Sequence, residues 1–479
     1  MSKKVVFSSS ILVLLITVSA FASSDANCAA QKSQPGFLPL PGDINTDCTV
    51  DFKDFALLAQ NWLMSGPSLQ GDIDKSGTID YTDLVIFIDK WLQDNSVPQP
   101  PLANSMLNVV MAGYQGWFRC PNDGANLGWI HWSYDGGVTF DVEMWPDMNE
   151  YVKKYQAGSY TLPDASKAYV YSPMDYQTVF THFKWMQQYG IDGVWFQRFL
   201  VDLPGGPNQN RYAANLQVLN NVQAACYMTD RIWAVSYDTA CMPTNSIYSS
   251  LTADWESLVA KGILNDPHYL HHNGKPVVSI WGFYTSSGNM TPVVGNQIID
   301  YFKGKDVYLF GGGNWDWVSV TDPQWSAMFR RFDAFGGWNI GNFSIDGEGK
   351  KWATTSYWAT AKSTAESVNM LFVPVLYAGY SWSKSTPSNF NLLPRMGGKF
   401  YWKQWVAATQ TGFGTVYLAM FDEVDEGTAI YKVTNSPPTQ RNYVTYEGYP
   451  SDWYMRLANE GCKMIRGQIP LTTTIPIQP

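Results

Sequence analysis

From residue 107 onward, short apolar runs rich in β-branched and aromatic residues alternate with longer segments in which apolar positions recur at a helical period. This alternation predicts a parallel sheet covered by helices. Eight strand–helix units favour a closed (β/α)8 barrel over an open doubly wound sheet. The sequence therefore predicts an α/β protein with a TIM-barrel domain, whose eight strands span residues 108–113, 193–199, 232–237, 276–281, 307–310, 334–338, 371–376 and 415–421.

The segments between these strands supply the expected helices. Amphipathic stretches cover residues 175–189, 212–228 and 363–369, and a last helix is expected over residues 451–465. The run that follows the first strand, residues 113–117, reads Gly-Tyr-Gln-Gly-Trp. It places a bulky ring where a dinucleotide fold needs backbone close to phosphate. The barrel is therefore not expected to use a nicotinamide cofactor.

Aromatic and hydrogen-bonding residues follow nearly every predicted strand. Active sites of TIM barrels lie at the carboxyl ends of their strands, so these residues are expected to share one face. Sugars pack their apolar faces on aromatic rings and need polar partners for their hydroxyls. The chain contains 21 tryptophans, although such residues can equally fill a core. The candidate substrate contacts are Tyr114, Trp117, Trp195, Gln197, Tyr237, Asp238, Trp281 and Tyr380.

Four acids follow the eighth strand, in the segment of residues 421–428 that reads Phe-Asp-Glu-Val-Asp-Glu-Gly-Thr. Glycosidic cleavage usually needs two carboxyl groups, and Glu423 and Glu426 are spaced so that both can lie on one side of a turn. Crowded carboxylates also raise one another's pKa, which favours an acid that is still protonated near neutral pH. A solvated acidic loop or a cation site are the alternatives. We expect Glu423 and Glu426 to be catalytic.

Other hydrolase chemistries have weaker support. The five histidines show no zinc-ligand spacing with a nearby acid, and no serine lies in a Gly-x-Ser-x-Gly elbow. Two alternatives to a glycoside hydrolase stay open. One is a non-catalytic carbohydrate-binding protein on the same barrel, and the other is a structural component docked to a scaffold.

An internal repeat with an offset of 29 positions occupies residues 40–95. In each unit, side chains with oxygen atoms alternate along a short loop that leads into an apolar helix ending in Trp-Leu. This spacing suits a hard cation such as Ca²⁺, and a second matching loop makes helix capping alone a poorer explanation. The sequence predicts a small all-α, EF-hand-like module that binds Ca²⁺ through Asp43, Asn45, Asp47 and Asp54 in one loop and Asp72, Asp74, Ser76 and Asp83 in the other.

The N-terminus predicts export. Residues 1–22 combine two lysines, an apolar run and the sequence Ala20-Phe21-Ala22, which is typical of a cleaved secretory signal. No later segment is long and apolar enough to span a membrane. A proline-rich linker is expected over residues 96–105 and the catalytic domain over residues 106–470. A formal charge of −9 disfavours nucleic-acid binding. The six cysteines allow disulfides, but the sequence does not show which cysteines pair.

Residues from about 108 to 467 resemble the family 71/99-like glycoside hydrolases. The family 99 motif after the last strand is Trp-Asn-Glu-Trp-His-Glu-Gly-Thr, and residues 421–428 keep both glutamates, the glycine and the threonine, while Val424 and Asp425 replace Trp and His. The early Tyr-Tyr-x-Trp-Tyr/Phe motif corresponds to residues 114–118. The resemblance implies retaining cleavage, with Glu426 as general acid and base. Glu423 would assist the sugar's 2-hydroxyl in attacking its own anomeric carbon, or would act as nucleophile or base in an ordinary displacement.

The repeat resembles a type I dockerin. Such modules bind Ca²⁺ in their loops and dock to a cohesin through their helices, so the resemblance implies structural Ca²⁺ and a cohesin-like partner. Cys48 stands where the sixth loop position is normally glycine, and Ser76 stands where the fifth is normally acidic. The first loop is therefore expected to be strained, or its Cys48 to pair with Cys28.

Overall fold

The computed structural model describes residues 40–89 and 102–479, apart from residues 287 and 385. The chain divides into two compact units, with the boundary between Pro101 and Leu102. We call the described part of the first unit the N-terminal module and the second unit the barrel domain. The predicted signal at residues 1–22 and most of the predicted linker lie outside the described residues.

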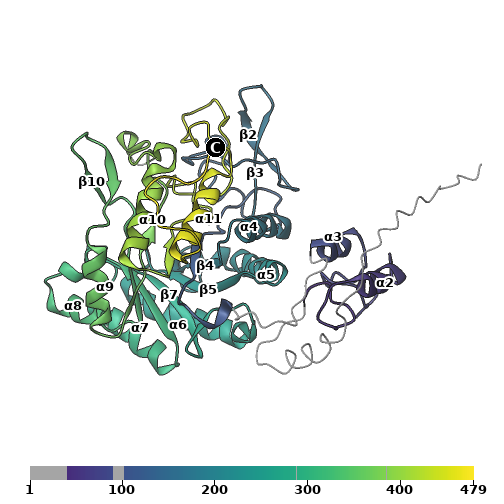
Figure 1. Ribbon diagram of the computed structural model, residues 1–479, viewed down its shortest axis with the longest axis horizontal. Coiled ribbons are helices and arrows are strands. Elements are labelled where there is room, and N and C mark those ends of the chain that lie inside the picture. Colours follow the sequence, from purple (N-terminus) through teal and green to yellow (C-terminus); the bar gives the residue numbers. More distant parts are fainter. Residues whose placement is uncertain (1–39, 90–101, 287, 385) are drawn as a thin grey trace, which may run out of the picture. The chain divides into compact units, whose positions relative to one another are not determined.

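Eight parallel strand positions form the sheet of the barrel domain, and Figure 1 shows several of them between the helices. They are β1 (Val110–Tyr114), β4 (Gly193–Phe199), β5 (Ile232–Asp238), β7 (Lys275–Phe283), β8 (Tyr308–Gly313), β9 (Ala334–Gly337), the seventh strand in two pieces, β12 (Leu371–Phe372) and β13 (Val375–Leu376), and β14 (Val416–Leu418). The sheet order is β12-β9-β8-β7-β5-β4-β1-β14-β13. All eight predicted strands are present at the expected places.

The seventh strand closes the sheet on itself. Its first piece, β12, pairs in parallel with β9, and its second piece, β13, pairs in parallel with β14. Pro374 lies between the two pieces and has no N–H to donate to a ladder. Because the two ends of the sheet order belong to one continuous segment of chain, the sheet forms a closed barrel.

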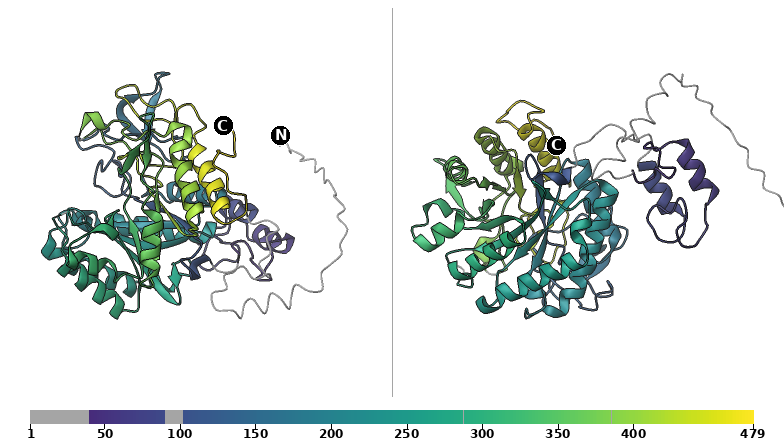
Figure 2. Two further views of the ribbon diagram at one scale, coloured as in Figure 1. Left: turned by 60° about the vertical axis from the view of Figure 1, so that its left-hand side comes forward. Right: turned by 90° about the horizontal axis from the view of Figure 1, so that it is seen from below.

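Helices cover the outside of this sheet, as Figure 2 shows from two further directions. The α-helices of the barrel domain are α4 (Tyr176–Gln188), α5 (Tyr212–Thr229), α6 (Thr244–Ala260), α7 (Pro292–Gly304), α8 (Pro323–Phe329), α9 (Trp358–Glu366), α10 (Lys399–Thr411) and α11 (Trp453–Ile465). The expected helix at residues 363–369 was placed too late in the chain, since α9 begins at Trp358 and the chain turns before the seventh strand. Short 3₁₀ helices are η1 (Leu102–Asn104), η2 (Leu200–Asp202), η3 (Gln209–Arg211), η4 (Ile263–Asn265), η5 (Trp317–Ser319), η6 (Pro387–Asn389) and η7 (Met396–Gly398).

Two antiparallel hairpins are added to the barrel. One is formed by β2 (Tyr155–Thr161) and β3 (Lys167–Val170) in the long segment between β1 and α4, and the other by β10 (Phe343–Ile345) and β11 (Lys351–Ala353) after β9. The two-residue strand β6 (His271–His272) pairs with the start of β7. Both hairpins follow the carboxyl end of a barrel strand, and both project from the upper side of the barrel domain in Figure 1. The segments at this end of the barrel are therefore the longest.

The barrel interior is filled by large rings, including Trp195, Trp281, Phe310 and Tyr417. At the amino-terminal end of the barrel strands, Ala103, Met106 and Val109 of the segment that enters the domain pack on this interior cluster. The backbone N–H of Met106 donates to His272 Nδ1 at 3.2 Å, and its carbonyl accepts from Thr415 Oγ1 at 2.7 Å. This segment closes the amino-terminal end and leaves the carboxyl end for function.

The N-terminal module consists of two loops, each followed by a helix, α2 (Phe52–Gln60) and α3 (Tyr81–Asp89). Its small core is made by Val50, Leu58, Ile79 and Phe87. The loops have matching conformations, since Cys48 and Gly77 at the sixth positions both have a left-handed backbone, with φ of 70° and 85°. A cysteine is strained there, as expected, whereas a glycine is not. Cys48 is disulfide-bonded, and its expected partner, Cys28, lies outside the described residues.

Candidate active site

Asp422 joins the loop after β14 to the loop after β1. Its two carboxylate oxygens accept hydrogen bonds from the backbone N–H groups of Gln115 at 2.8 Å and Gly116 at 2.9 Å. Burial raises the pKa of Asp422 to about 6, although these two N–H groups act in the opposite direction. The acid is almost completely buried. It therefore acts as a clasp that fixes the loop after β14 to the end of the first strand.

Glu423 lies beside this clasp and is also buried. Its Oε1 accepts from the backbone N–H groups of Asp425 at 2.7 Å and Glu426 at 3.2 Å, and its Oε2 accepts from the side-chain amide of Gln115 at 2.9 Å. Three donors are thus directed at one carboxyl group. Burial and the neighbouring charges of Asp425 and Glu426 raise its pKa well above the usual range.

Glu426 follows one turn later and is partly exposed to solvent. Burial raises its pKa to about 7, the charges of Asp425 and Asp238 act in the same direction, and Lys384 opposes them. We refer to Glu423 and Glu426 as the carboxyl pair. Among the described residues, three N–H donors are directed at the Glu423 carboxyl group and none at the Glu426 side chain. Hydrogen bonding thus favours the ionised form of Glu423, whereas burial and the neighbouring acids favour its protonated form.

Asp425, between the two glutamates, is held by residues from two other loops. Its Oδ2 lies 2.9 Å from His131 Nδ1, and its Oδ1 lies 3.4 Å from Lys384 Nζ. The His131 ring stacks on Trp117 with centroids 3.8 Å apart and an angle of 4°. Burial lowers the pKa of His131, while Asp425 acts in the opposite direction. The loops after the first, seventh and eighth strands therefore meet at one carboxylate.

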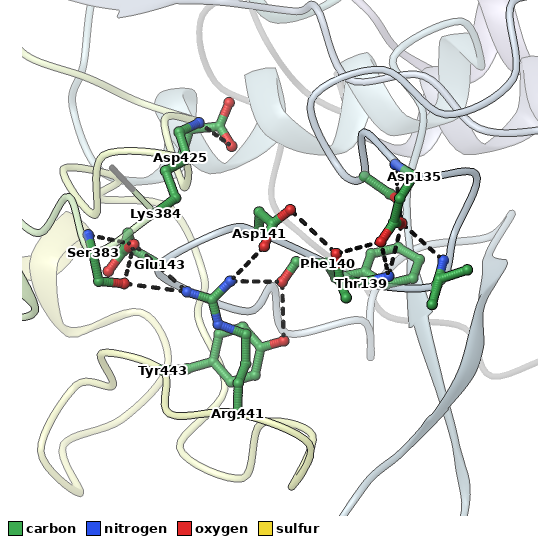
Figure 3. A network of polar contacts seen from close by, with 12 residues as sticks. Asp135, Thr139, Phe140, Asp141, Glu143, Ser383, Lys384, Asp425, Arg441 and Tyr443 are labelled. Carbon is green, nitrogen blue, oxygen red and sulfur yellow. Dashed lines mark hydrogen bonds and ion pairs between the residues drawn. The ribbon is translucent and has the colours of Figure 1, made fainter. Parts of the chain in front are cut away.

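Another buried carboxylate, Glu143, contacts the same loops (Figure 3). Its Oε1 accepts from the backbone N–H and the hydroxyl of Ser383 at 2.8 and 2.7 Å, and its Oε2 accepts from the hydroxyl of Ser381. Its backbone N–H donates to the carbonyl of Val424 at 2.8 Å, and the N–H of Ser381 donates to the carbonyl of Glu426 at 2.9 Å. The backbone of the loop after β14 is thus fixed on both sides of Asp425.

Four of the eight predicted binding residues lie close to this acidic cluster. The Gln197 amide donates to Asp238 Oδ2 at 3.1 Å, and burial raises the pKa of Asp238 to about 6. Tyr380 has its pKa raised to about 12, by burial first and then by the charges of Glu426 and Glu143. Trp117 stacks on His131, as described above. The structure thus brings Gln197, Asp238, Tyr380 and Trp117 together with the predicted acids.

The other four predicted binding residues have different surroundings. Tyr114 and Tyr237 are buried and face the helices, where their hydroxyls bond to His182 on α4 at 2.9 Å and to Asp254 on α6 at 2.9 Å. Trp195 and Trp281 belong to the ring cluster inside the barrel, with exposed fractions of 1% and 6%. Their assignment as sugar contacts is corrected, because their strands direct these side chains into the helix layer or the interior.

Several residues at the site had no role in the sequence-based expectation. Gln115 orients Glu423, and His131 and Lys384 hold Asp425. Tyr284, which follows β7, has its pKa raised by burial and then by the charges of Asp238 and Glu426. Gln115 lies within the early motif at residues 114–118, where it replaces the second Tyr, but the motif does not indicate a contact with Glu423. His131, Lys384 and Tyr284 lie in segments after strands and belong to no motif, so only the fold reveals them.

The two loops of the N-terminal module each gather three carboxylates. Oxygen atoms of Asp43, Asp47 and Asp54 lie within 4.8 Å of one another, and so do those of Asp72, Asp74 and Asp83. Asp54 and Asp83 are fully buried and accept backbone N–H groups of their own loops. The amide of Asn45 donates to Asp47 Oδ2 at 3.1 Å, and the N–H of Ser76 donates to Asp74 Oδ1 at 3.0 Å. Each predicted ligand set is therefore gathered around one loop.

Residues 338–466 match glycosyl hydrolase family 99. The matched segment runs from the end of β9 through the last helix and includes Tyr380, Glu423 and Glu426. The chain is also 30% identical to the glycoprotein endo-alpha-1,2-mannosidase of Rattus norvegicus over 104 residues, which is 22% of each protein. It is 28% identical to a glycoprotein endo-alpha-1,2-mannosidase-like protein of Danio rerio over 104 residues, 24% of that protein. The chain thus matches less than a quarter of the length of these relatives.

A solved structure extends the likeness to the whole barrel. The GH99 endo-alpha-mannosidase from Bacteroides thetaiotaomicron superimposes with a TM-score of 0.57 at 15% identity, over 75% of this chain and 98% of that one. This likeness supports the barrel fold that the strand pairing shows. The matches are with family 99, and the family 71 part of the expected resemblance has no support among them.

Proposed function

We propose that the barrel domain is a glycoside hydrolase that cleaves glycosidic bonds in a polysaccharide or glycan. The observation that carries this proposal is the carboxyl pair on one loop at the carboxyl end of the barrel. One member is oriented by three N–H donors, and the other has a pKa of about 7 and partial access to solvent. A partly exposed acid that is half protonated near neutral pH suits protonation of a leaving oxygen.

We propose the roles of the two glutamates from the resemblance to family 99, and their surroundings are compatible with these roles. Glu426 donates its proton to the leaving oxygen and later accepts one from water. Glu423, ionised and held by Gln115, accepts the proton of the sugar's 2-hydroxyl as that oxygen attacks the anomeric carbon. In the second step, water that Glu426 deprotonates attacks the anomeric carbon, the bond from that carbon to O2 breaks, and O2 regains its proton from Glu423. Two successive inversions at that carbon give retention of configuration. We propose that Gln197, Asp238 and Tyr380 bind sugar hydroxyls, since all three lie near the carboxyl pair.

The named relatives suggest the first substrates to try. The Rattus norvegicus and Bacteroides thetaiotaomicron proteins are described as endo-acting α-mannosidases. An α-linked mannan is therefore the first member of a panel that also contains plant, algal and bacterial glycans. Val424 and Asp425 replace the Trp and His of the resembled motif, so the panel has to extend beyond mannose. Val424 is fully buried here, and Asp425 is engaged with His131 and Lys384.

The test compares wild type with Glu426→Gln and Glu423→Gln on this panel. Each substitution is expected to lower kcat by about 10²–10⁴-fold, because general acid–base catalysis contributes that much. Proton NMR of the first product formed shows its anomeric configuration, and the same anomer as the substrate is expected. Binding of a glycan by wild type without turnover of any panel member would favour the non-catalytic carbohydrate-binding protein instead.

We propose further that the N-terminal module binds Ca²⁺ as a structural ion and docks to a cohesin-like partner. The two gathered carboxylate sets support the first part, because Ca²⁺ prefers six to eight oxygen ligands. Exposed Phe52 and Tyr81, at matching positions in the repeat, support the second part, with exposed fractions of 74% and 72%. A cohesin domain on a sensor surface tests the docking, and loss of binding in chelator is the expected result.

Export of the protein stays a prediction from residues 1–22, which lie outside the described residues. Among the described residues, none of the helices combines the length and apolar character that a membrane span needs. Secretion is tested by expressing the chain with and without residues 1–22 and assaying the medium or periplasm.

A further inference from the structure

We call the loop after β14 that carries the carboxyl pair, residues 419–428, the catalytic loop. Next to it, the surface contains a hollow of about 440 Å³ that nothing in the proposed chemistry uses. It is lined by Ser383, Pro387, Phe390, Arg441 and Asn442. The lining combines an aromatic ring and a proline with a hydroxyl, a guanidinium and an amide. Sugars present both apolar faces and hydroxyls, so a lining of this mixture suits a sugar ring better than a purely apolar ligand.

The polar side of the hollow is rigid, because a buried carboxylate organises it (Figure 3). Glu143 accepts from both the N–H and the hydroxyl of Ser383. Arg441 donates to the Ser383 hydroxyl at 3.2 Å, to the carbonyl of Phe140 at 3.1 Å and to Asp141 at 3.1 Å. These side chains are held before any ligand arrives, and such preorganisation reduces the cost of binding.

Lys384 connects the hollow to Asp425, which lies between the two members of the carboxyl pair. Lys384 follows Ser383 directly, lies 3.4 Å from Asp425 and is placed over the Trp382 ring at 4.4 Å and the Tyr134 ring at 5.5 Å. Tyr134 is 59% exposed. Two aromatic rings therefore flank the short stretch between the hollow and the acids.

The charges at the hollow select among sugars. Arg441 is compensated by Asp141 at 3.1 Å and Glu143 at 3.8 Å, and Lys384 is compensated by Asp425. Because nearby carboxylates already balance the charge of each cation, neither side chain is expected to attract a sulfate or carboxylate group of a sugar. The buried acids of the catalytic loop would also repel an anionic chain.

We propose that this hollow is a distal subsite that binds an uncharged sugar residue of the same glycan, further along the chain than the bond to be cleaved. The proposal rests on the proposed hydrolase function and deepens it. Phe390 provides the apolar platform, and Arg441 and Asn442 provide hydroxyl contacts. The backbone bonds of Glu143 and Ser381 to the catalytic loop fix the distance between this subsite and the carboxyl pair.

The test measures affinity as a function of glycan length. Neutral α-linked manno-oligosaccharides of increasing length are titrated by calorimetry into Glu426→Gln, which binds without turnover, and into the same protein with Phe390→Ala or Asn442→Ala. Asn442 is exposed and Phe390 is partly buried, so Asn442→Ala keeps the fold even if Phe390→Ala does not. Thr386→Ala, an exposed change on the same loop outside the lining, is the matched control.

Both lining variants should weaken binding of the longer oligosaccharides about tenfold and leave the shortest that binds unchanged. Equal loss for short and long chains, or an equal effect of Thr386→Ala, would overturn the subsite while wild-type turnover still upheld the hydrolase. Tighter binding of a sulfated ladder than of the neutral one would overturn the choice of an uncharged sugar. Failure of every glycan to bind or be cleaved would overturn the hydrolase and the subsite together.

Discussion

Glu426→Gln should make the folded barrel domain more stable at alkaline pH while removing activity. A carboxyl group whose pKa is higher in the folded than in the unfolded chain is harder to ionise when folded. Ionisation of Glu426 therefore costs folding free energy, and a neutral glutamine of the same shape avoids that cost. The expected gain equals the folding free energy that is lost by keeping an ionisable group in this acidic cluster.

The size of the gain follows from the shift in pKa. The pKa of Glu426 rises from 4.5 to about 7. Each unit corresponds to about 1.4 kcal/mol, so the full shift is worth about 3 kcal/mol above pH 7. Partial exposure to solvent reduces this figure, and we expect about 1–3 kcal/mol. The cost falls as pH drops from 7 to 4.5 and is absent below 4.5, where both forms of the chain are protonated.

The assay is urea denaturation of wild type and Glu426→Gln at pH 8 and at pH 4.5, followed by tryptophan fluorescence. The variant should unfold at higher urea concentration at pH 8 and at the same concentration at pH 4.5. Glu366→Gln is the control, because that side chain is 62% exposed, and its effect should stay below about 0.5 kcal/mol. Equal stability of Glu426→Gln and wild type at pH 8, or a gain that persists at pH 4.5, would refute the reasoning.

Three further predictions concern other charged groups. Lys384→Met removes a cation that lowers the pKa of both members of the carboxyl pair. The pH profile of kcat/KM should therefore move to higher pH by about one unit, and Lys384→Arg should restore it. A profile that does not move would contradict this. Asp254→Asn breaks a fully buried ion pair with Arg198 and should cost about 3–5 kcal/mol in urea denaturation, whereas a loss below 1 kcal/mol would exclude a structural role. Calorimetry with Ca²⁺ should show two binding events in wild type and one in Asp72→Ala; absence of heat in wild type would rule out the ion.

The order of strands was predictable from sequence because it depends on where apolar runs begin and end. The direction of individual side chains was not predictable, because both faces of a barrel strand are buried. In β5, Tyr237 faces α6 while its neighbour Asp238 faces the acidic cluster, yet both end the same apolar run. A shift of one residue along the strand would exchange which of the two side chains faces the helix and which faces the acidic cluster.

The carboxyl pair was predictable because its two members lie three residues apart after a strand. Its partners were not, because they come from distant segments. His131 and Lys384 are separated from Asp425 by long stretches of chain and meet it only when the loops after the first and seventh strands fold over the eighth. The positive φ of His131, 62°, shows how specific that loop conformation is. Periodicity gives no information about such contacts.

The interrupted seventh strand gives the barrel an uneven resistance to opening. Between β4 and β5, seven consecutive residue pairs are in register, whereas β12 and β13 each contribute two pairs, and to different neighbours. Amide protons around Pro374 should therefore exchange with solvent earlier than those of β4. β13 adjoins β14, and the loop after β14 carries the carboxyl pair. Local opening of the sheet is therefore expected beside this loop, while the pairing of β4 with β5 stays intact.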